Sequence, residues 1–414
     1  MDTATPLPEL SVDALVDATP DHRDRVVDFF RAVSIGVVVL WHWSLSITHW
    51  RAGALTMPNP VGDVPGLWAA TWVLQVMPVF FFVGGYANLA GWEAVGRGGD
   101  GAAGRFLCSR MRRLVGPLIP WLGCWLVADL AWRAAGGRSV LAWGTVVFVP
   151  LWFLGVYAGV VLAVPVTARM HARWRWRVPA ALVAAALAAD VLRLGPDVGG
   201  AVVGLAGSAC VWLFCHQLGY FWRDGTLSIQ IDTCGAAVEV GGCRSVSMLA
   251  VGRRRAGALV AAGLGGLVVL TAVGPYPAAM VAVRGAGTSN MFPTTACIAA
   301  LATFQLGVVL WLHPRLDALL RRRAAWRAVV AANGLAMPVF CWHMTALVVF
   351  LGLYEWAGFS LAEAPTADWW LTRPVWVAGP GVLLAGLIGV AARPGRRVPP
   401  PGRRARRERG RAEG

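Results

Sequence analysis

The sequence predicts an all-α fold, a polytopic membrane bundle of about ten transmembrane helices. Of its 414 residues, 57% are hydrophobic and only 14% are charged, and the mean hydropathy is +0.59. A soluble domain carries about 25% charged residues. The apolar runs are long and continuous, not alternating, which favours helices over a transmembrane barrel. A helix also satisfies its backbone polar groups within one segment, as lipid requires.

Ten apolar runs are long enough to cross a bilayer. The fifth is short and ends in Asp190 and Arg193, and no repeat with a period of about 20–50 residues is visible. The predicted spans are 26–48, 67–91, 114–132, 148–168, 178–195, 199–222, 256–274, 294–313, 328–352 and 374–392.

One membrane domain over 26–392 therefore lies between two tails. Residues 1–25 are polar and are predicted to be a disordered cytoplasmic tail, so that the first span acts as a signal anchor. Residues 393–414 are rich in Arg and Pro and are predicted to be a second disordered tail. The connection from Gly225 to Gly252 is the longest predicted inside, and its stretch LSIQIDTCGAAVEV alternates enough for a small hairpin.

Arginine placement orients the bundle, because cytoplasmic connections carry an excess of basic residues. Arg-rich connections alternate with Arg-poor ones along the whole chain, which predicts that both termini are cytoplasmic and that the protein lies in the plasma membrane. The rich connections hold Arg97, Arg105, Arg110, Arg112 and Arg113; Arg169, Arg173, Arg175 and Arg177; Arg253, Arg254 and Arg255; and Arg315, Arg321, Arg322, Arg323 and Arg327. The poor ones hold Arg51; Arg133 and Arg138; Arg193; Arg284; and Arg373.

The net charge of +15 would suggest nucleic-acid binding in a soluble protein. Here the arginines flank apolar runs, so orientation and contact with anionic lipid account for the charge, and no nucleic-acid partner is expected. The eight cysteines include no CxxC pair, so no metal or redox site is predicted. Cys234 and Cys243 share a connection and could pair, but that connection falls on the reducing side.

Arg31 and His42 lie in the first apolar run, VVDFFRAVSIGVVVLWHWSLSI, where ionisable side chains are costly and usually functional. They are eleven residues apart, which is about 20° past three full helical turns, so both lie on one helix face, roughly 16 Å apart along the axis. Asp28, one turn before Arg31, could form a simple ion pair with it at the helix end. His42 could be satisfied by a backbone carbonyl, but the shared face favours a polar track with His42 as a general base.

The stretch CSRMRRLVGPLIPW places Arg110, Arg112 and Arg113 at the inner mouth of the third span. They could be ordinary positive-inside anchors. Planar guanidinium groups also match phosphate oxygens, so they could instead form a phosphate clamp. Pro117 and Pro120 follow and predict a kink.

Further polar residues interrupt later spans. The stretch MPVFFFVGGYANLAGW contains two adjacent glycines that allow close helix approach or a local break, with Tyr86 and Asn88 as polar handles. His216 lies toward the inner end of the sixth span, and His343 lies in the middle of the ninth, with Asn333 earlier in the same helix. The outer segment GPYPAAMVAVRGAGTSNMFPTT could form an ordered re-entrant loop or a plain connection.

In these motifs the sequence resembles the acyltransferase 3 family of integral membrane O-acyltransferases, especially its actinobacterial branch. The first span is similar to the family's Asp-x-x-Arg and Arg-x10-His patterns through Asp28, Arg31 and His42. The second is similar to Phe-Phe-Phe-x-x-Gly-Gly over 80–85, and the third to Arg-x-x-Arg-x-x-x-Pro from Arg110 to Pro117. LWFLGVY, HQLGYFWRDG, YPAAM, SNMFPTT and CWHMTAL also resemble the branch, although Ala279 and Phe292 stand where Ser and Pro are expected, and the family's fused hydrolase-like domain is absent.

The resemblance implies transfer of an acyl group, commonly acetyl, from cytoplasmic acyl-CoA to a hydroxyl, with no tightly bound cofactor. The implied acceptor is a cell-envelope glycan, a lipid-linked sugar or a secondary metabolite. His42 would be the base, Arg31 would bind phosphate or stabilise the oxyanion, and an acyl-His42 intermediate or direct transfer are both open. The arginines of the third span would hold the CoA phosphates. Tyr86, Asn88, His216, Tyr276, Asn290 and His343 are candidates to line the substrate path.

Two other classes of protein share some of these sequence features. A transporter or flippase for a polar lipid or metabolite could use the same intramembrane polar residues, but many transporters contain internal repeats, and none is visible. A non-catalytic membrane scaffold would not need Arg31 and His42 on one face.

Overall fold

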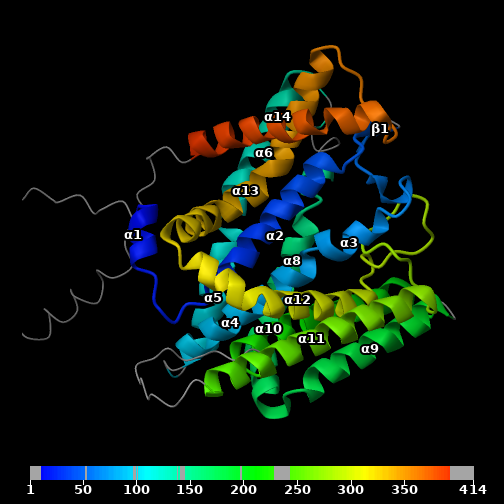
Figure 1. The fold of residues 1–414 in the computed structure, drawn as a ribbon. Helices are drawn as coiled ribbons and strands as arrows, with labels where there is room; N and C mark the ends of the chain where they lie inside the picture. Colours follow the sequence, from blue (N-terminus) through cyan, green and yellow to red (C-terminus); the bar gives the residue numbers. More distant parts are fainter. Residues whose placement is uncertain are drawn as a thin grey trace, which may run out of the picture.

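The computed structural model describes residues 11–51, 54–96, 99, 101–137, 139, 145–195, 198–227 and 243–391. Its helices form one bundle beside a short hairpin, which confirms the all-α membrane fold (Figure 1). The helices are α1 (Val12–Asp17), α2 (Arg25–Ser44), η1 (Pro60–Gly62), α3 (Trp68–Leu74), α4 (Met77–Gly96), α5 (Ala102–Val115), α6 (Leu118–Ala134), α7 (Thr145–Phe148), α8 (Leu151–Trp174), α9 (Arg177–Leu194), α10 (Gly200–Arg223), α11 (Cys243–Ala272), α12 (Ala296–Leu320), α13 (Arg323–Trp356) and α14 (Ala367–Ala391). The hairpin pairs β1 (His49–Arg51) with β2 (Ala54–Thr56), antiparallel, with Trp50 opposite Leu55.

Within the described residues, nine helical segments are long and apolar enough to cross a membrane. The helix α9, which is the predicted fifth span, is not among them and contains three charged residues, Arg177, Asp190 and Arg193. Hydrogen bonds between its neighbours show how it runs. Thr167 of α8 bonds Tyr220 of α10, and His171, one turn later in α8, bonds Asp224, just after α10. Both helices therefore run in the same direction. The intervening α9 must therefore return across the bundle.

The helices α2 and α13 are parallel in the same sense, because Arg31 bonds Asn333 and His42 bonds His343. That arrangement requires an odd number of membrane crossings between them, and the ten-span count provides seven. The start of α2 and the end of α14 consequently lie on the same side of the bundle, at the left of Figure 1. Which side is cytoplasmic stays a prediction.

The helix α2 begins at a good N-cap, because the Asp24 side chain accepts a hydrogen bond from the backbone N–H of Val26. It ends at Ser44, not at 48 as predicted, because the chain turns there toward the hairpin and the Ile47 N–H bonds the Pro58 carbonyl. His42 therefore lies in the last turn of α2, and not six residues before the helix end as the predicted span 26–48 would place it.

Burial falls from the centre of the bundle to its rim. In an apolar 18-residue window of Trp68–Gly96, 72% is buried inside the protein, whereas the corresponding share in Ala102–Ala134 is only 17%. Apolar side chains such as Leu126 and Val127 are correspondingly exposed on α6, as expected of a surface that faces lipid. The predicted interruption of the third span is present, because α5 and α6 are separated at Gly116–Pro117.

Part of the segment predicted as a disordered tail over 1–25 is ordered. The helix α1 packs against the start of α13, where Arg323 pairs with Asp17 and Arg327 Nε lies 3.1 Å from Asp13 Oδ1. These ion pairs hold a polar segment that hydropathy alone could not place. The predicted hairpin between Gly225 and Gly252, the possible Cys234–Cys243 pair and the tail 393–414 lie outside the described residues.

Candidate active site

Two of the candidate histidines meet where α2 and α13 lie side by side. His42 Nδ1 is 3.0 Å from His343 Nε2, and the two rings are nearly parallel, with an interplanar angle of 6°. His343 is fully buried, and Trp43 Nε1 donates to its backbone carbonyl at 3.1 Å. Each histidine was predicted as a candidate by itself, and the structure brings them together.

The hydrogen bonds fix the tautomers of the neutral pair. His343 Nδ1 lies 2.8 Å from the Phe340 carbonyl oxygen, which can only accept, so Nδ1 carries the proton. His343 Nε2 is then an acceptor, and His42 Nδ1 must donate to it. His42 Nε2 is left with its lone pair, as a general base requires.

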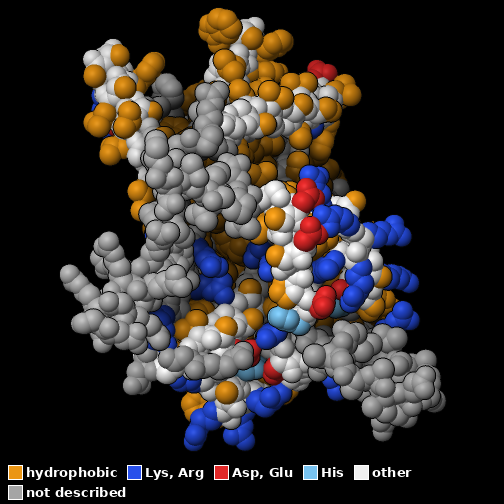
Figure 2. All heavy atoms as spheres, turned by 90° about the vertical axis from the view of Figure 1, so that its left-hand side faces the viewer, with side chains coloured by type: hydrophobic (Ala, Val, Ile, Leu, Met, Phe, Trp, Pro, Cys, Tyr) orange, Lys and Arg blue, Asp and Glu red, His pale blue; other side chains and the backbone are white. Residues whose placement is uncertain are grey.

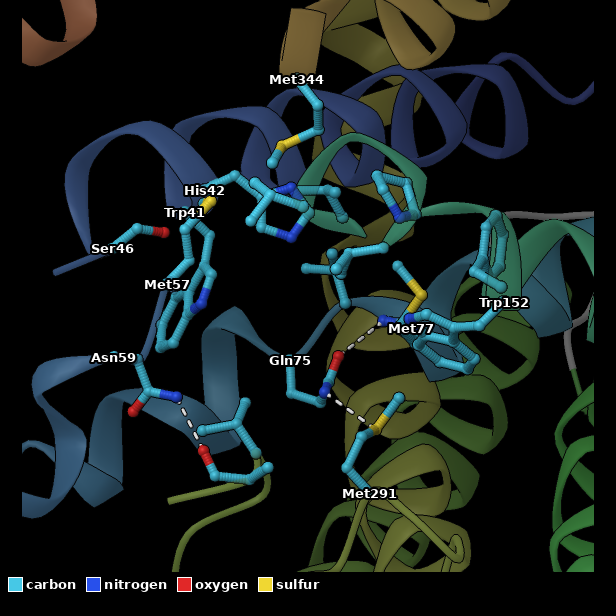
Figure 3. Close-up of a pocket in the computed structure, with 18 of the residues that line it drawn as sticks. Trp41, His42, Ser46, Met57, Asn59, Gln75, Met77, Trp152, Met291 and Met344 are labelled. Atoms are coloured by element: carbon cyan, nitrogen blue, oxygen red, sulfur yellow. Dashed lines mark hydrogen bonds between the residues drawn. The ribbon is translucent and has the colours of Figure 1, made fainter. Parts of the chain in front are cut away.

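His42 lies on the wall of a cavity of about 470 Å³ (Figure 3). Aromatic side chains, among them Trp41, Trp152 and Phe340, line the cavity together with four methionines and a larger set of aliphatic side chains. The cavity lies at the end of α2 that is farthest from Arg31, between the segment after that helix and residues of the loop over 281–291.

An interruption of the second span forms another side of the cavity. The helices α3 and α4 are separated at Gln75–Val76, and the Gln75 side chain bonds Met280 O at 3.2 Å and the Met77 N–H at 3.3 Å. Gln305 donates to the backbone carbonyl of Gln75 at 2.9 Å. Such irregular backbone inside a membrane protein is tolerated where it lines a cavity.

A charged cluster lies at the other end of α2. Arg31 Nη2 is 3.0 Å from Asp28 Oδ1, and Arg31 Nε donates to Asn333 Oδ1 at 2.7 Å. Asn333 in turn donates to the Asp28 carbonyl at 2.9 Å, which holds its amide in place. Asp28 also accepts two bonds from Arg23, and these raise the pKa of the Arg23 guanidinium despite its partial burial.

The arginines of α5 differ in their surroundings. Arg110 is half-buried, donates to the Ala87 carbonyl at 2.8 Å and interacts electrostatically with both Arg31 and Arg113. A Cβ on Gly91 would collide with the Arg110 guanidinium, so this glycine leaves room for it. Arg112 and Arg113 are exposed. Figure 2 shows that arginines gather on this face of the molecule, mostly in its lower half.

Asn88 and His216 form a buried polar contact between α4 and α10. Asn88 Nδ2 lies 3.1 Å from His216 Nε2 and 3.4 Å from the Tyr157 hydroxyl. Tyr86 lies nearby on α4, and Arg223 Nη1 is 3.5 Å from its hydroxyl. These residues do not line the cavity beside His42.

Tyr276 and Asn290 stabilise the loop between α11 and α12. Tyr276 donates to Asp190 at 3.1 Å, and Asn290 Nδ2 donates to the Pro277 and Ala279 carbonyls at 2.6 and 3.0 Å. The segment is therefore held by hydrogen bonds near its two ends, where its buried residues lie, whereas residues 284–288 in its middle are exposed. Neither residue lines the cavity, although the adjacent Met291 does.

Sequence reasoning missed Gln75, Tyr157 and the Phe340 carbonyl. A signal for a helix start after Gln75 was present, since Pro is favoured in the first turn of a helix and Pro78 lies within this apolar run. No comparable signal marks a backbone carbonyl. In the part of the chain that the structure describes, no three His, Cys, Asp or Glu side chains come together as a metal site.

The chain was compared with known proteins. A family model described as an acyltransferase domain matches residues 24–400, more than nine-tenths of the 414 residues. No curated protein and no solved structure matches the chain.

Proposed function

Because the chain belongs to the acyltransferase 3 family, it is a multi-pass membrane acyltransferase, and we propose that it transfers an acyl group from acyl-CoA to an acceptor hydroxyl with His42 as the base. One observation carries the proposal. The hydrogen-bonded series Phe340–His343–His42 leaves the His42 Nε2 lone pair available beside a cavity.

In the proposed reaction, His42 Nε2 removes the proton of the acceptor hydroxyl as its oxygen attacks the thioester carbonyl. The C–S bond breaks as the tetrahedral intermediate collapses, and the CoA thiolate leaves and takes the proton from His42. His343 keeps the proton of His42 on Nδ1 and orients the ring. An uncharged imidazole partner supplies this orientation without adding a negative charge, in contrast to a carboxylate.

The donor would be held at the Asp28 end of α2. Arg31, Arg110 and Arg113 interact electrostatically in that region, and a polyanion such as the CoA phosphates would relieve their mutual repulsion. Arg112 adds a further exposed cation on α5, the helix of Arg110 and Arg113. Arg31 lies roughly 16 Å along the helix from His42, which favours a phosphate or pantetheine contact over stabilisation of the oxyanion.

We retain the plasma membrane as the proposed location. The acceptor classes also stay as proposed from the resemblance: an envelope glycan, a lipid-linked sugar or a small metabolite. The transporter alternative needs no acyl donor, and membership of an acyltransferase family disfavours it.

The decisive experiment replaces His42 in the full-length protein in lipid nanodiscs. With the general base removed, His42→Ala should reduce acyl transfer from acetyl-CoA by about 10²-fold or more. His22→Ala, at an exposed position before α2, is the matched control and should retain full activity. Full activity of a normally folded His42→Ala protein would refute the assignment.

A further inference from the structure

The side chains that line the cavity beside His42 determine which kind of ligand it can bind. We infer that it binds the acyl acceptor, and that this acceptor is an uncharged alcohol with a largely apolar body. The inference rests on the proposed function and narrows its acceptor, because it disfavours acidic glycans and unsubstituted sugars.

The described side chains that line this cavity carry no formal charge. No Asp, Glu, Lys or Arg lines the cavity among the residues that the structure describes, and His42 is neutral when it acts as a base. A buried charge without a partner is strongly unfavourable. An acceptor with a carboxylate, phosphate or ammonium group on the part that enters would find nothing to pair with it.

The cavity also offers a ligand only a small number of hydrogen bonds. The Asn59 amide already donates to the Ala282 carbonyl at 2.7 Å, and its oxygen accepts from the Val61 N–H. Gln75 is similarly engaged by Met280 and Met77. Four side-chain groups remain for a ligand, and none of them has a hydrogen bond to any described residue: His42 Nε2, the Ser46 hydroxyl, and the indole N–H groups of Trp41 and Trp152. Ser46 is labelled beside Trp41 in Figure 3.

A sugar ring presents several hydroxyls, and each one buried without a partner costs about 1–3 kcal/mol. Of the four available groups, the two indoles can only donate and His42 Nε2 can only accept, so they satisfy one reacting hydroxyl and few further polar atoms. The cavity therefore matches an alcohol with few polar groups better than a polyol.

The wall of the cavity also contains flexible side chains that can adapt to the shape of a ligand. Met57, Met77, Met291 and Met344 line the cavity together with aromatic rings. Methionine is unbranched and flexible and fits irregular apolar shapes. A volume of about 470 Å³ is typical of sites for drug-sized ligands, so the cavity can hold a compact ring system in addition to the reacting hydroxyl.

The cavity and the arginines lie at opposite ends of α2, so donor and acceptor can approach His42 from two directions. The same volume could instead receive a long acyl chain from the donor. The test therefore varies the acyl chain of the donor and the structure of the acceptor independently, so that the effect of each on the reaction can be told apart.

The test uses the full-length protein in nanodiscs with four probe acceptors: borneol and testosterone as apolar alcohols, and glucose and glucuronic acid as polar ones. Acetyl-CoA is the donor, and octanoyl-CoA is the second donor. We expect acetylation of at least one apolar alcohol at a rate at least tenfold above that of either polar acceptor. Preferential acetylation of glucose or glucuronic acid would overturn the inference.

The cavity is then narrowed by Met57→Trp, with Met170→Trp on α8, away from the cavity, as the matched control. Met57→Trp should raise the KM for testosterone at least tenfold and leave the KM for acetyl-CoA within twofold, whereas the control should change neither. If Met57→Trp impairs octanoyl-CoA but not the acceptor, the cavity holds the acyl chain and the inference is wrong.

A binding measurement separates this inference from the proposed function. The His42→Ala protein should still bind the apolar alcohol in equilibrium dialysis, and addition of Met57→Trp should abolish that binding. Binding without any acyl transfer in the unmodified protein would support the cavity assignment and contradict the catalytic one. Transfer to sugars alone would support catalysis and contradict the acceptor class.

Discussion

His42 can act as a base only if its proton lies on the ring nitrogen that faces away from the substrate, and the hydrogen bonds to His343 and Phe340 impose that arrangement. The Phe340 carbonyl is a fixed acceptor within α13, so the order of donors and acceptors has one solution for two neutral rings. His343 is therefore a positioning residue. It acts through His42 and is not expected to touch the acyl group.

Replacement of His343 tests this role. His343→Phe removes the acceptor for His42 Nδ1 and should lower kcat by about 10²-fold, within the range that general-base catalysis contributes, while the KM for acyl-CoA stays within twofold. His343→Gln retains an oxygen that can accept the proton and should restore part of the lost kcat. A packing role alone would predict no difference between the two variants once their thermal stabilities are equal, as measured by unfolding in detergent.

The sequence predicted both histidines from the cost of ionisable groups in lipid, but it did not predict their contact. They are 301 residues apart, and a single sequence does not indicate which two of ten helices are neighbours. For the same reason Asn333 was noted without its partner, Arg31.

Among the elements, α4 and α10 cross closely at Gly85 and Gly219. A Cβ on Gly85 would collide with the His216 carbonyl oxygen, and one on Gly219 would collide with the Phe82 carbonyl oxygen. The helix α4 continues without a break through Gly85. This glycine therefore allows close helix approach, which is the first of the two alternatives predicted for the adjacent glycines of α4. The approach also brings Asn88 to His216.

We expect Gly85→Ala to separate these helices and to destabilise the protein by about 1–3 kcal/mol, as overpacking does elsewhere. Gly159→Ala is the matched control, because this glycine lies inside α8 with open space around its position, and alanine there should be neutral or slightly stabilising. Thermal unfolding in detergent would compare the two variants. Equal midpoints for Gly85→Ala and Gly159→Ala would contradict the close-packing argument.

Most helix positions could be predicted, because the length of an apolar run reflects the thickness of the bilayer. The interruption between α3 and α4 could not be predicted from hydropathy, since Gln75 is one polar residue in a strongly apolar run. Its amide is satisfied by Met280 and Met77, contacts that form only in the folded bundle. The early end of α2 is a further example, because the hairpin after it depends on tertiary contacts.

At the scale of the whole molecule, the charged cluster and the apolar cavity lie at opposite ends of α2. The parallel pairs α2–α13 and α8–α10 place the start of α2 and the end of α14 on one side. If the proposed donor site is right, acyl-CoA, which does not cross membranes, must reach the protein from that side. The arginine asymmetry of the sequence predicts that it is the cytoplasmic one.

Proteoliposomes with the protein inserted in both directions test this sidedness. An epitope fused after α14 reports, by antibody access, the fraction of molecules whose α14 end faces outward. Acetyl-CoA added outside should be consumed at an initial rate proportional to that fraction, because only those molecules expose Arg112 and Arg113 to it. A rate proportional to the opposite fraction would place the donor site at the other end of α2.

The double variant Arg112→Ala/Arg113→Ala tests whether the positive charges on this side of the protein bind the phosphates of the donor. Exposed ion pairs contribute about 0.2–1 kcal/mol each, so the loss of two should raise the KM for acetyl-CoA by about 2- to 30-fold, and its dependence on salt should weaken. Arg254→Ala, an exposed arginine on α11, is the control and should keep the original KM and salt dependence. An unchanged KM in the double variant would mean that these two arginines only orient the chain in the membrane, and the phosphate contacts would then have to come from Arg31 and Arg110 alone.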